Sequence, residues 1–389
     1  MNNTYDVIVA GGGIMGSAIA YELAKKNQRV LVVERDDQTA GAAGATDGVV
    51  GYHTKKAGFH MDLAVRSIAM FPGLSEELGM DIEYGEGCGG MLVIEDVEQL
   101  ELMEALAEAQ RVSGVDIQVI DIQKARELEP HLSSKLVGAL YSPTGGKVNP
   151  LKLTFAYAAA AKRLGAVFQN RTEVQGVIRD GNTVRGVNTT AGDFFCEKLV
   201  IATGAWSAAL GDMAGFPLPI KPRKGQLVVT EPVGPFLNCT MQCARYFVIK
   251  NRPESITDEY ILRTGASMSI EQMDDGAIII GSTRELVGFD SENTLESFES
   301  ILRRATALFP ALRDVHVIRA FAGFRPYTPD GLPFIGKVNT VEGLYVGAGH
   351  EGDGIALAPI TGRLLAEEIV DGAPSFSLEP FDPNRFAKA

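Results

Sequence analysis

Residues 5–34 read YDVIVAGGGIMGSAIAYELAKKNQRVLVVE, and this stretch decides the fold. Residues 5–10 are short, rich in β-branched side chains and followed at once by glycines, as expected of a buried strand. Residues 14–26 place apolar side chains at helical spacing and end in two lysines, which predicts a helix. Residues 29–34 form a second apolar strand. The order strand, helix, strand predicts a parallel pair joined by a right-handed crossover.

The glycines between the first strand and the helix form the pattern G-x-G-x-x-G. In this pattern Gly11 allows a tight turn, Gly13 lets the backbone approach a pyrophosphate, and Gly16 lets the helix pack closely on the strand. The first turn of the helix offers free N–H groups to phosphates. Glu34 ends the second strand about 20 residues further on, where a carboxylate accepts a ribose hydroxyl and disfavours a 2′-phosphate. The stretch therefore predicts an adenine-dinucleotide site.

Composition places this site in a globular enzyme of two domains. The chain has 389 residues, more than one hydrophobic core usually supports, and 46% of them are hydrophobic. Its 43 glycines exceed the ~7% average, so many backbone positions need tight turns or close approach. The net charge of −13 argues against a nucleic-acid partner. No run approaches the ~20 apolar residues of a membrane span, and no signal peptide is visible. We expect a cytoplasmic protein, free or at the inner face of the membrane.

Cysteine and histidine are too scattered to predict a metal site or a disulfide framework. The four cysteines contain one close pair, Cys239 and Cys243, and no second pair completes a metal set. The five histidines show no H-E-x-x-H pairing. We therefore expect ordinary thiols and no metal.

Three further segments carry small residues where a ligand would approach the backbone. Residues 41–51 are rich in glycine and alanine and come directly after the second nucleotide strand. Thr203 and Gly204 follow an apolar strand at 198–202, at the edge where open α/β sheets bind ligands. Residues 349–354 precede a closing helix at 356–370, whose N-terminus would face an electron-rich carbonyl of a ligand.

Four segments together resemble the FAD-dependent amine and amino-acid oxidoreductases of the D-amino-acid oxidase superfamily, of the glycine oxidase and sarcosine oxidase type. They span nearly the whole chain in the order found in that family. The segments are the fingerprint ending in Glu34 and Arg35, residues 41–48 (GAAGATDG), residues 201–207 (IATGAWS), and residues 323–331 (GFRPYTPDG) followed by 347–355 (GAGHEGDGI).

The resemblance implies an α/β fold: a glutathione-reductase-like Rossmann domain for FAD, and an α+β substrate domain with a mixed or antiparallel sheet beneath the flavin. Because the nucleotide signals lie in separated segments, we expect the FAD domain to assemble from residues 1–80, 145–215 and 322–389. The substrate domain is then expected from residues 81–144 and 216–321.

The resemblance also implies which residues bind FAD, and that FAD is held without a covalent bond because no cysteine or histidine stands at the known attachment positions. Most of these residues offer backbone N–H groups or small side chains to the cofactor. They are Gly11, Gly13, Ile14, Met15, Gly16, Glu34, Arg35, Ala43, Gly44, Ala45, Thr46, Gly48, Val49, Val174, Thr203, Gly204, Trp206, Gly349, Glu351, Gly352, Asp353, Gly354 and Ile355.

For the substrate, Arg325 is the leading residue, because it matches the arginine that binds a carboxylate in glycine-oxidase-like relatives. A guanidinium suits this role through its two-pronged hydrogen bonding. His350 is a catalytic candidate that either contacts substrate or caps the last helix. Tyr52 and His53 follow the flavin loop and line the cavity in one interpretation or pack in the core in the other, and Met268 is a further substrate-contact candidate.

The chain departs from glycine oxidases at two places. Residues 351–353 are Glu-Gly-Asp where those enzymes carry an arginine, and the strand at 268–272 lacks an expected tyrosine. The GHEGDGI run is closer to dye-linked proline or hydroxyproline dehydrogenases and hydrogen-cyanide-synthase-like subunits. Residues 239–264 also look like an insertion. These features favour a dehydrogenase that works as one subunit of a heteromer.

The expected reaction is oxidation of a C–N bond in an amino acid or secondary amine by hydride transfer to flavin N5, giving an imine that hydrolyses. The cofactor supplies the chemistry, so the protein needs positioning and electrostatics. The electron acceptor is left open between O2, a quinone and a partner subunit. Two alternatives remain: an FAD-dependent 2-hydroxy-acid dehydrogenase, and a flavoprotein subunit active only within a heteromeric complex.

Overall fold

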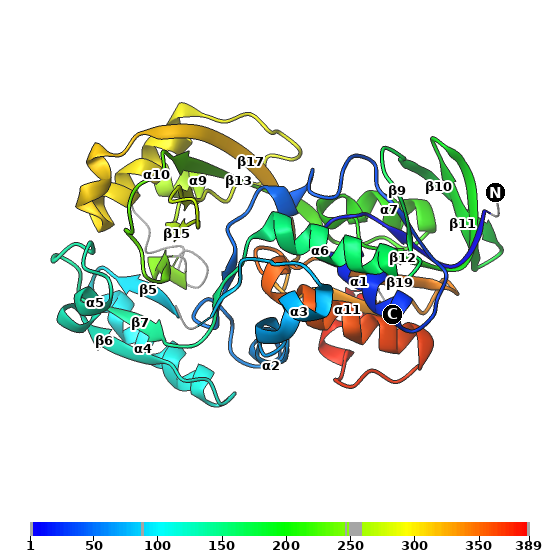
Figure 1. The fold of residues 1–389 in the computed structure, drawn as a ribbon, viewed down its shortest axis with the longest axis horizontal. Coiled ribbons are helices and arrows are strands. Elements are labelled where there is room, and N and C mark those ends of the chain that lie inside the picture. Colours follow the sequence, from blue (N-terminus) through cyan, green and yellow to red (C-terminus); the bar gives the residue numbers. More distant parts are fainter. Residues whose placement is uncertain (1–2, 87–88, 246, 249–258, 387–389) are drawn as a thin grey trace.

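The computed structural model describes residues 3–86, 89–245, 247–248 and 259–386, and it contains two large sheets that lie next to one another (Figure 1). Cys88 and residues 246 and 249–258 of the segment interpreted as an insertion lie outside the described residues. The fingerprint forms the predicted strand, helix and strand: β1 (Thr4–Ala10), α1 (Ile14–Lys25) and β2 (Val30–Val33).

The first sheet has a parallel centre. β1 pairs in parallel with β2 and with β12 (Gly192–Ile201), β2 pairs in parallel with β9 (Val167–Gln169), and β12 pairs in parallel with β19 (Leu344–Ala348). Antiparallel strands extend it: β10 (Val174–Asp180) and β11 (Thr183–Thr189) continue from β12, and β18 (Phe334–Lys337) pairs with β19. β10 and β11 pair with each other as an antiparallel hairpin.

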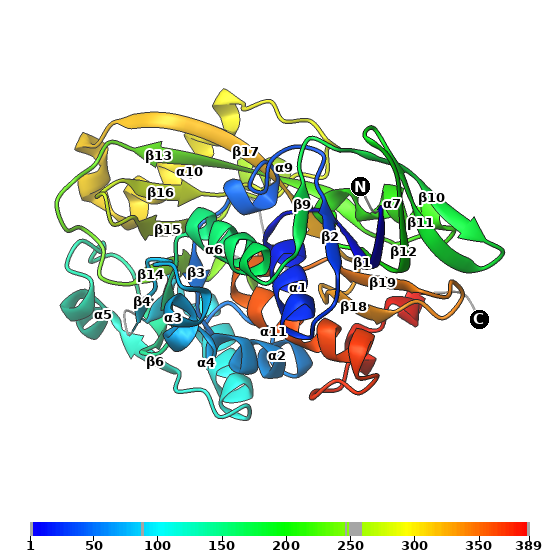
Figure 2. The same cartoon turned by 45° about the vertical axis from the view of Figure 1, so that its right-hand side comes forward.

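Helices cover this sheet because alternate strand residues face opposite sides. Val7 and Val9 of β1 belong to the core beneath α1, α6 (Pro150–Arg163) and α11 (Gly354–Val370). Ile8 and Ala10 belong to the core on the other face, together with residues of α7 (Ser207–Ala214). Figure 2 shows α6, α1 and α11 in a row across the first face, with α2 (Phe59–Ile68) packed against α11.

The second sheet is antiparallel except for one pair, β14 with β5. Its order is β17 (Val317–Tyr327), β13 (Lys221–Thr230), β16 (Ile278–Gly281), β15 (Ser269–Gln272), β14 (Thr240–Cys243), β5 (Gly90–Ile94), β7 (Gly138–Ser142) and β6 (Gln118–Asp121). One face packs on α10 (Leu295–Leu308) and α5 (Ile122–Leu128), and α4 (Val97–Arg111) packs near β5 and β7. The short helix α9 (Glu259–Thr264) packs on α10.

The long strand β17 arches from the second sheet toward the first in Figure 1. A third, small sheet consists of β3 (Val49–Val50), β8 (Gly146–Lys147) and β4 (Gly85–Glu86). All strands of the first sheet fall in the segments predicted for FAD, whereas β17 crosses the predicted boundary at residue 322. The division into two domains stays a prediction.

The apolar residues at 61–78 have helical spacing, and the chain there forms α2, then a 3-10 turn at Phe71–Gly73, then α3 (Leu74–Leu78). Pro72 lacks a backbone N–H and its ring obstructs the preceding turn, so the helix ends before it.

The described residues also bear on the cysteines and on the membrane. Cys196, Cys239 and Cys243 are buried free thiols. Among the described helices, none is long and apolar enough to cross a bilayer.

Candidate functional site

A continuous trough runs along the carboxyl ends of β1, β2, β12 and β19 and then beneath the second sheet. Two adjoining pockets make it up. One reaches from Glu34 to His350, and the other from Asp47 to Arg325. They share the lining residues Ile14, Ala42, Ala43, Glu351 and Gly354.

The glycines of the fingerprint act in three different ways. Gly11 has a φ of +102°, and a Cβ there would lie 2.5 Å from the carbonyl oxygen of Ala202. A Cβ on Gly16 would lie 1.8 Å from the carbonyl oxygen of Gly11, so this glycine lets α1 pack on the end of β1. Gly13 caps α1 and lines the trough, and its Cβ would meet only Gln38, at 4.0 Å. A side chain at residue 13 would therefore project into the space that a pyrophosphate needs.

The far end of the trough suits a ribose and an adenine. Glu34 lines it, and its Oε2 accepts a hydrogen bond from the backbone N–H of Gly12 at 2.7 Å. Arg35 lies over the Trp206 ring at 4.7 Å, and Trp206 in turn stacks on Phe289 at 4.8 Å. The predicted residues Val174, Thr203, Gly204 and Gly349 also line this end.

The glycine- and alanine-rich loop after β2 is packed against its surroundings with no room to spare. A Cβ on Gly44 would lie 2.1 Å from the carbonyl oxygen of Thr39, and one on Gly48 would lie 1.7 Å from that of Val148. The backbone N–H of Gly48 donates to Glu271 Oε2 at 3.0 Å. Burial, and then the charge of Asp47, raises the pKa of Glu271 to about 8. The loop is thus fixed where it passes between the two pockets.

The N-terminus of α11 faces the junction of the two pockets. Gly352, Asp353, Gly354 and Ile355 all line the substrate end of the trough. Because α11 is a helix of 17 residues, its first turn supplies free N–H groups and a partial positive charge there. Glu351 lies in the left-handed region with a φ of +49°, and its carboxylate accepts a hydrogen bond from Arg223 Nη2 at 2.6 Å.

These features fit FAD. Gly13 leaves space for a pyrophosphate at the start of α1, Glu34 stands where a ribose hydroxyl would lie, and the first turn of α11 points at the flavin end. Of the residues predicted to hold FAD, Gly16, Gly44 and Gly48 act through packing and do not line either pocket.

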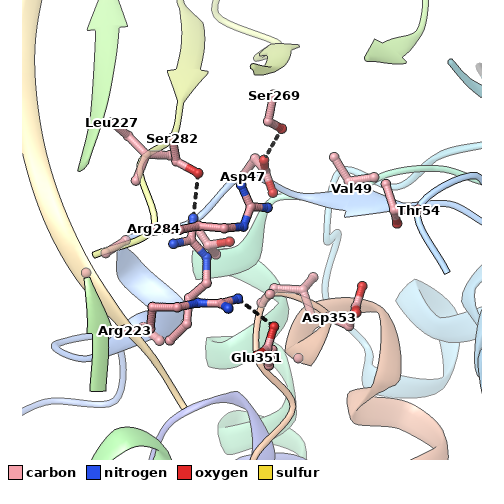
Figure 3. Close-up of a pocket in the computed structure, with 18 of the residues that line it drawn as sticks. Asp47, Val49, Thr54, Arg223, Leu227, Ser269, Ser282, Arg284, Glu351 and Asp353 are labelled. Carbon is pink, nitrogen blue, oxygen red and sulfur yellow. Dashed lines mark hydrogen bonds and ion pairs between the residues drawn. The ribbon is translucent and has the colours of Figure 1, made fainter. Parts of the chain in front are cut away.

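Three guanidinium groups line the substrate end. Arg325 comes from β17. Arg223 comes from β13 and Arg284 from the segment after β16 (Figure 3). Arg223 and Arg325 are direct partners in the antiparallel pairing of β13 with β17, so their side chains share one face of the sheet. Arg223 is neutralised by Glu351, and Arg284 donates to Ser267 Oγ.

Both terminal nitrogens of the Arg325 guanidinium are held by hydrogen bonds. Nη1 donates to the carbonyl oxygen of Thr283 at 3.0 Å, and Nη2 donates to Ser282 Oγ at 2.6 Å. A Cβ on Gly225 would lie 2.2 Å from Nη1, so the guanidinium lies over this glycine. Burial, and then the charges of Arg284 and Arg223, lowers the pKa of Arg325 to about 9. An anion bound beside Arg325 therefore stabilises its charged form.

A second charged group closes the opposite wall. Lys55, which is 2% exposed, donates to Asp353 Oδ1, and His60 Nε2 lies 3.4 Å from Asp353 Oδ2. Lys55 and Asp353 both line the pocket. Figure 3 shows Thr54 and Asp353 across the pocket from Arg223 and Arg284.

The other predicted substrate residues lie at different depths. Met268 lines the pocket, whereas Tyr52 and His53 do not. His53 is fully buried, and its Nε2 lies 2.5 Å from Oε1 of the pocket residue Gln242. His350 lines the nucleotide end, where its Nε2 lies 3.0 Å from Thr361 Oγ1. Burial lowers the pKa of His350 to about 3 and that of His53 to about 4, so both rings are neutral.

Several pocket residues were not found from the sequence. Asp47 lies inside the glycine- and alanine-rich segment 41–51, and Lys55 lies just beyond it. Nothing in their spacing indicates that their charges face a cavity. The pocket residues Arg223 and Arg284, and Gly225 beneath the Arg325 guanidinium, stand in ordinary strand and turn sequence. The only available signal was that Gly225 interrupts an otherwise apolar and long-chain strand, which is a common mark of close approach.

Comparisons with known proteins agree with this geometry. The FAD dependent oxidoreductase (DAO) family matches residues 6–368. The chain is 33% identical to the hydrogen cyanide synthase subunit HcnC of Pseudomonas aeruginosa, over 99% of this chain and 97% of that protein. It is 32% identical to the glycine oxidase of Geobacillus kaustophilus, over 99% of this chain and 98% of that protein.

Solved structures give the same result. The crystal structure of the Geobacillus kaustophilus glycine oxidase superposes with a TM-score of 0.88 and covers 99% of this chain and 100% of its own. That of an L-proline dehydrogenase from P. horikoshii, 29% identical, has a TM-score of 0.89 and covers 99% and 98%. The predicted combination of a Rossmann-type FAD fold and a largely antiparallel second sheet is confirmed.

Proposed function

Since the chain belongs to the family of FAD-dependent oxidoreductases, we propose that it oxidises the C–N bond of an amino acid or secondary amine whose carboxylate is bound by Arg325. FAD, when bound, supplies the acceptor for the hydride that leaves the substrate carbon. The protein's own residues bind and orient the substrate and keep water away from it.

One observation carries the proposal: Arg325 presents an incompletely used guanidinium to the pocket. The group has five N–H donors, and the two hydrogen bonds to Thr283 and Ser282 leave three of them for a ligand. A carboxylate also supplies a negatively charged partner for the Arg325 guanidinium. Gly352 and Gly354 at the start of α11 line the same pocket, so a carboxylate on Arg325 holds a small substrate near the flavin end.

FAD is held without a covalent bond in this proposal. No cysteine lines either pocket among the residues that the structure describes, and the lining histidine, His350, is engaged with Thr361. Yellow chromophore released into the supernatant by acid precipitation supports this, and flavin that stays with the precipitate contradicts it.

The direct test of the reaction is anaerobic bleaching of the flavin absorbance by a panel of compounds. The panel contains proline, hydroxyproline, sarcosine, glycine, D-amino acids and 2-hydroxy acids. Bleaching by one or more amino acids supports the proposal. Bleaching by 2-hydroxy acids alone contradicts the proposal and supports the alternative, an FAD-dependent 2-hydroxy-acid dehydrogenase.

We further propose that the chain is a dehydrogenase subunit of a heteromer in the cytoplasm. Support comes from the name of the HcnC relative, which is that of a synthase subunit, and from the three buried free thiols, which suit a reducing compartment. Reoxidation of the reduced enzyme by an artificial dye, and not by O2, is the expected result. Rapid reoxidation by O2 identifies an oxidase instead.

A further inference from the structure

A row of hydrogen bonds leads from the core to a single carboxylate in the pocket. His53 Nε2 lies 2.5 Å from Gln242 Oε1, Gln242 Nε2 donates to Ser269 Oγ at 3.3 Å, and Ser269 Oγ lies 2.5 Å from Asp47 Oδ2 (Figure 3 shows the last step). Gln242 Oε1 only accepts, so His53 carries its proton on Nε2. Every donor in the row then points toward Asp47. The row therefore ends on Oδ2 of Asp47, which accepts.

Asp47 differs from the other acids of the pocket. Glu351 is paired with Arg223, and Asp353 is paired with Lys55. Across the described part of the chain, Asp47 has no cation within ion-pair distance, and its side chain accepts a hydrogen bond from the Ser269 hydroxyl. Its backbone is fixed, because Gly48 is pinned between Val148 and Glu271. A pocket carboxylate that is fixed in position and has no cationic partner is suited to bind a positively charged group of a ligand.

We propose that Asp47 binds the ammonium group of the substrate and accepts one of its protons. This rests on the proposed function, in which Arg325 holds the carboxylate of the same molecule. In the step, one N–H bond of the ammonium breaks, an O–H bond forms on Asp47, and the electron pair stays on nitrogen. The substrate becomes a neutral amine, the form from which a C–N bond is oxidised. The preferred substrate is then a zwitterion with a primary or secondary amine.

Other charged groups lie around Asp47, and the test must distinguish their titration from that of Asp47. Glu271 follows two residues after Ser269 on β15, and its pKa is raised first by burial and then by the charge of Asp47. The charge of Lys147 lowers the pKa of Glu271, and that of Asp274 raises it. Arg325 on β17 is also influenced by Asp47, and Arg284, Glu351 and Asp353 line the same pocket.

The decisive experiment measures the rate of anaerobic flavin reduction from pH 6 to 10 in the holoenzyme with Asp47→Asn, using the best amino acid of the panel. We expect the saturated rate at pH 7 to fall by about 100-fold, as on loss of a general base. The rate should recover as the pH approaches the pKa of the substrate amine, because the neutral amine then enters by itself. A rate that stays at the wild-type value at pH 7, or falls by the same factor at every pH, overturns the proposal.

Matched variants isolate the role of the carboxylate. Asp274→Asn makes the same substitution at an exposed acid paired with Lys147 outside the pocket, and it should leave the pH profile unchanged. Ser269→Ala should give a smaller loss, roughly 10-fold, with the same alkaline recovery. In the double variant that adds Glu271→Gln to Asp47→Asn, the recovery should persist. If it disappears, Glu271 and not the substrate is the titrating group, and the proposal fails.

Binding of pyrrole-2-carboxylate supplies a readout apart from turnover. This probe has a carboxylate but no basic nitrogen, and its affinity is measured from the change in the flavin spectrum. We expect Asp47→Asn to bind it as tightly as the wild type, with unchanged FAD content. Weaker binding by more than about 3-fold would show general damage to the pocket and count against the proposal.

The two proposals fail differently. A wild-type enzyme that no amino acid bleaches refutes the proposed function, and this inference with it. A wild-type enzyme that amino acids bleach, with an Asp47→Asn variant equal to it, refutes this inference alone.

Discussion

The nucleotide end of the trough is built mainly from backbone, whereas the substrate end is built from charged side chains. At the nucleotide end, Gly11, Gly13 and Gly16 bring strand, helix and ligand space together within six residues. At the substrate end, Arg223, Arg284 and Arg325 arrive from separate parts of the second sheet. At the first end, the close backbone contacts of Gly11 and Gly16 leave no room for a side chain, and Gly13 faces the ligand space. The second end depends on where charges stand, so its substitutions should change affinity and rate more than fold.

The largest expected effect is at the nucleotide end. Gly13→Val should abolish FAD binding, because the added side chain occupies the pyrophosphate space, yet Gly13 has an ordinary φ of −67° and no close neighbour. The apoprotein should therefore still fold. FAD content is read from the ratio of flavin to protein absorbance, and folding from circular dichroism. A variant that keeps its full FAD would disprove the assignment of the trough.

The next effect is at the substrate end. Arg325→Ala should lower kcat/KM for a carboxylated substrate by roughly 10²–10³-fold, the cost of losing a charged hydrogen-bonded partner. Arg325→Lys keeps the charge but loses the fork, so KM should rise with FAD content preserved. Amines without a carboxylate should be affected little.

Arg319→Ala is the matched control for Arg325, since Arg319 lies on the same strand but is exposed and outside the pocket. Wild-type kinetics in Arg325→Ala and Arg325→Lys would make Arg325 a structural residue.

A subtler change tests whether position matters as much as charge. Gly225→Ala leaves every charge in place but puts a methyl group against the Arg325 guanidinium, which must move. We expect about a 10-fold rise in KM, equivalent to losing roughly one hydrogen bond, with little loss of stability because the displaced atoms end a flexible side chain. Steady-state kinetics and a melting curve separate the two. Unchanged KM would mean that the guanidinium does not need its place over Gly225.

The smallest effect concerns stability and pH. The pKa of Glu271 is raised from 4.5 to about 8, so between these values the folded chain holds a proton that the unfolded chain releases. The free energy of unfolding therefore falls as the pH rises through this window. Glu271→Gln removes the effect, and its Tm should exceed that of the wild type by on the order of 2–4 °C at pH 8–9 and by least at pH 5. The opposite trend with pH would contradict the burial of this acid.

The same contrast explains what the sequence could predict. The fingerprint can be recognised in the sequence because it depends on backbone conformations that only glycine permits, at positions in a fixed local order. Arg325 was found through family resemblance, and its partners across the sheet were not found, because strand pairing sets which residues of β13 meet β17. His53 was assigned equally to cavity and core, and the structure places it behind Gln242, where the chain after β3 turns its ring inward.

The direct pairing of Arg223 with Arg325 has a consequence for the folded protein as a whole. Like charges that face each other across two strands are destabilising, and Glu351 neutralises only Arg223, so the sheet is weakened beside Arg325, where it is needed for binding. A carboxylate that binds there relieves the repulsion and stabilises the native state by mass action. Small organic anions should therefore raise the melting temperature even when they are not substrates. A bound anion thus stabilises the sheet at the position where Arg223 and Arg325 face each other.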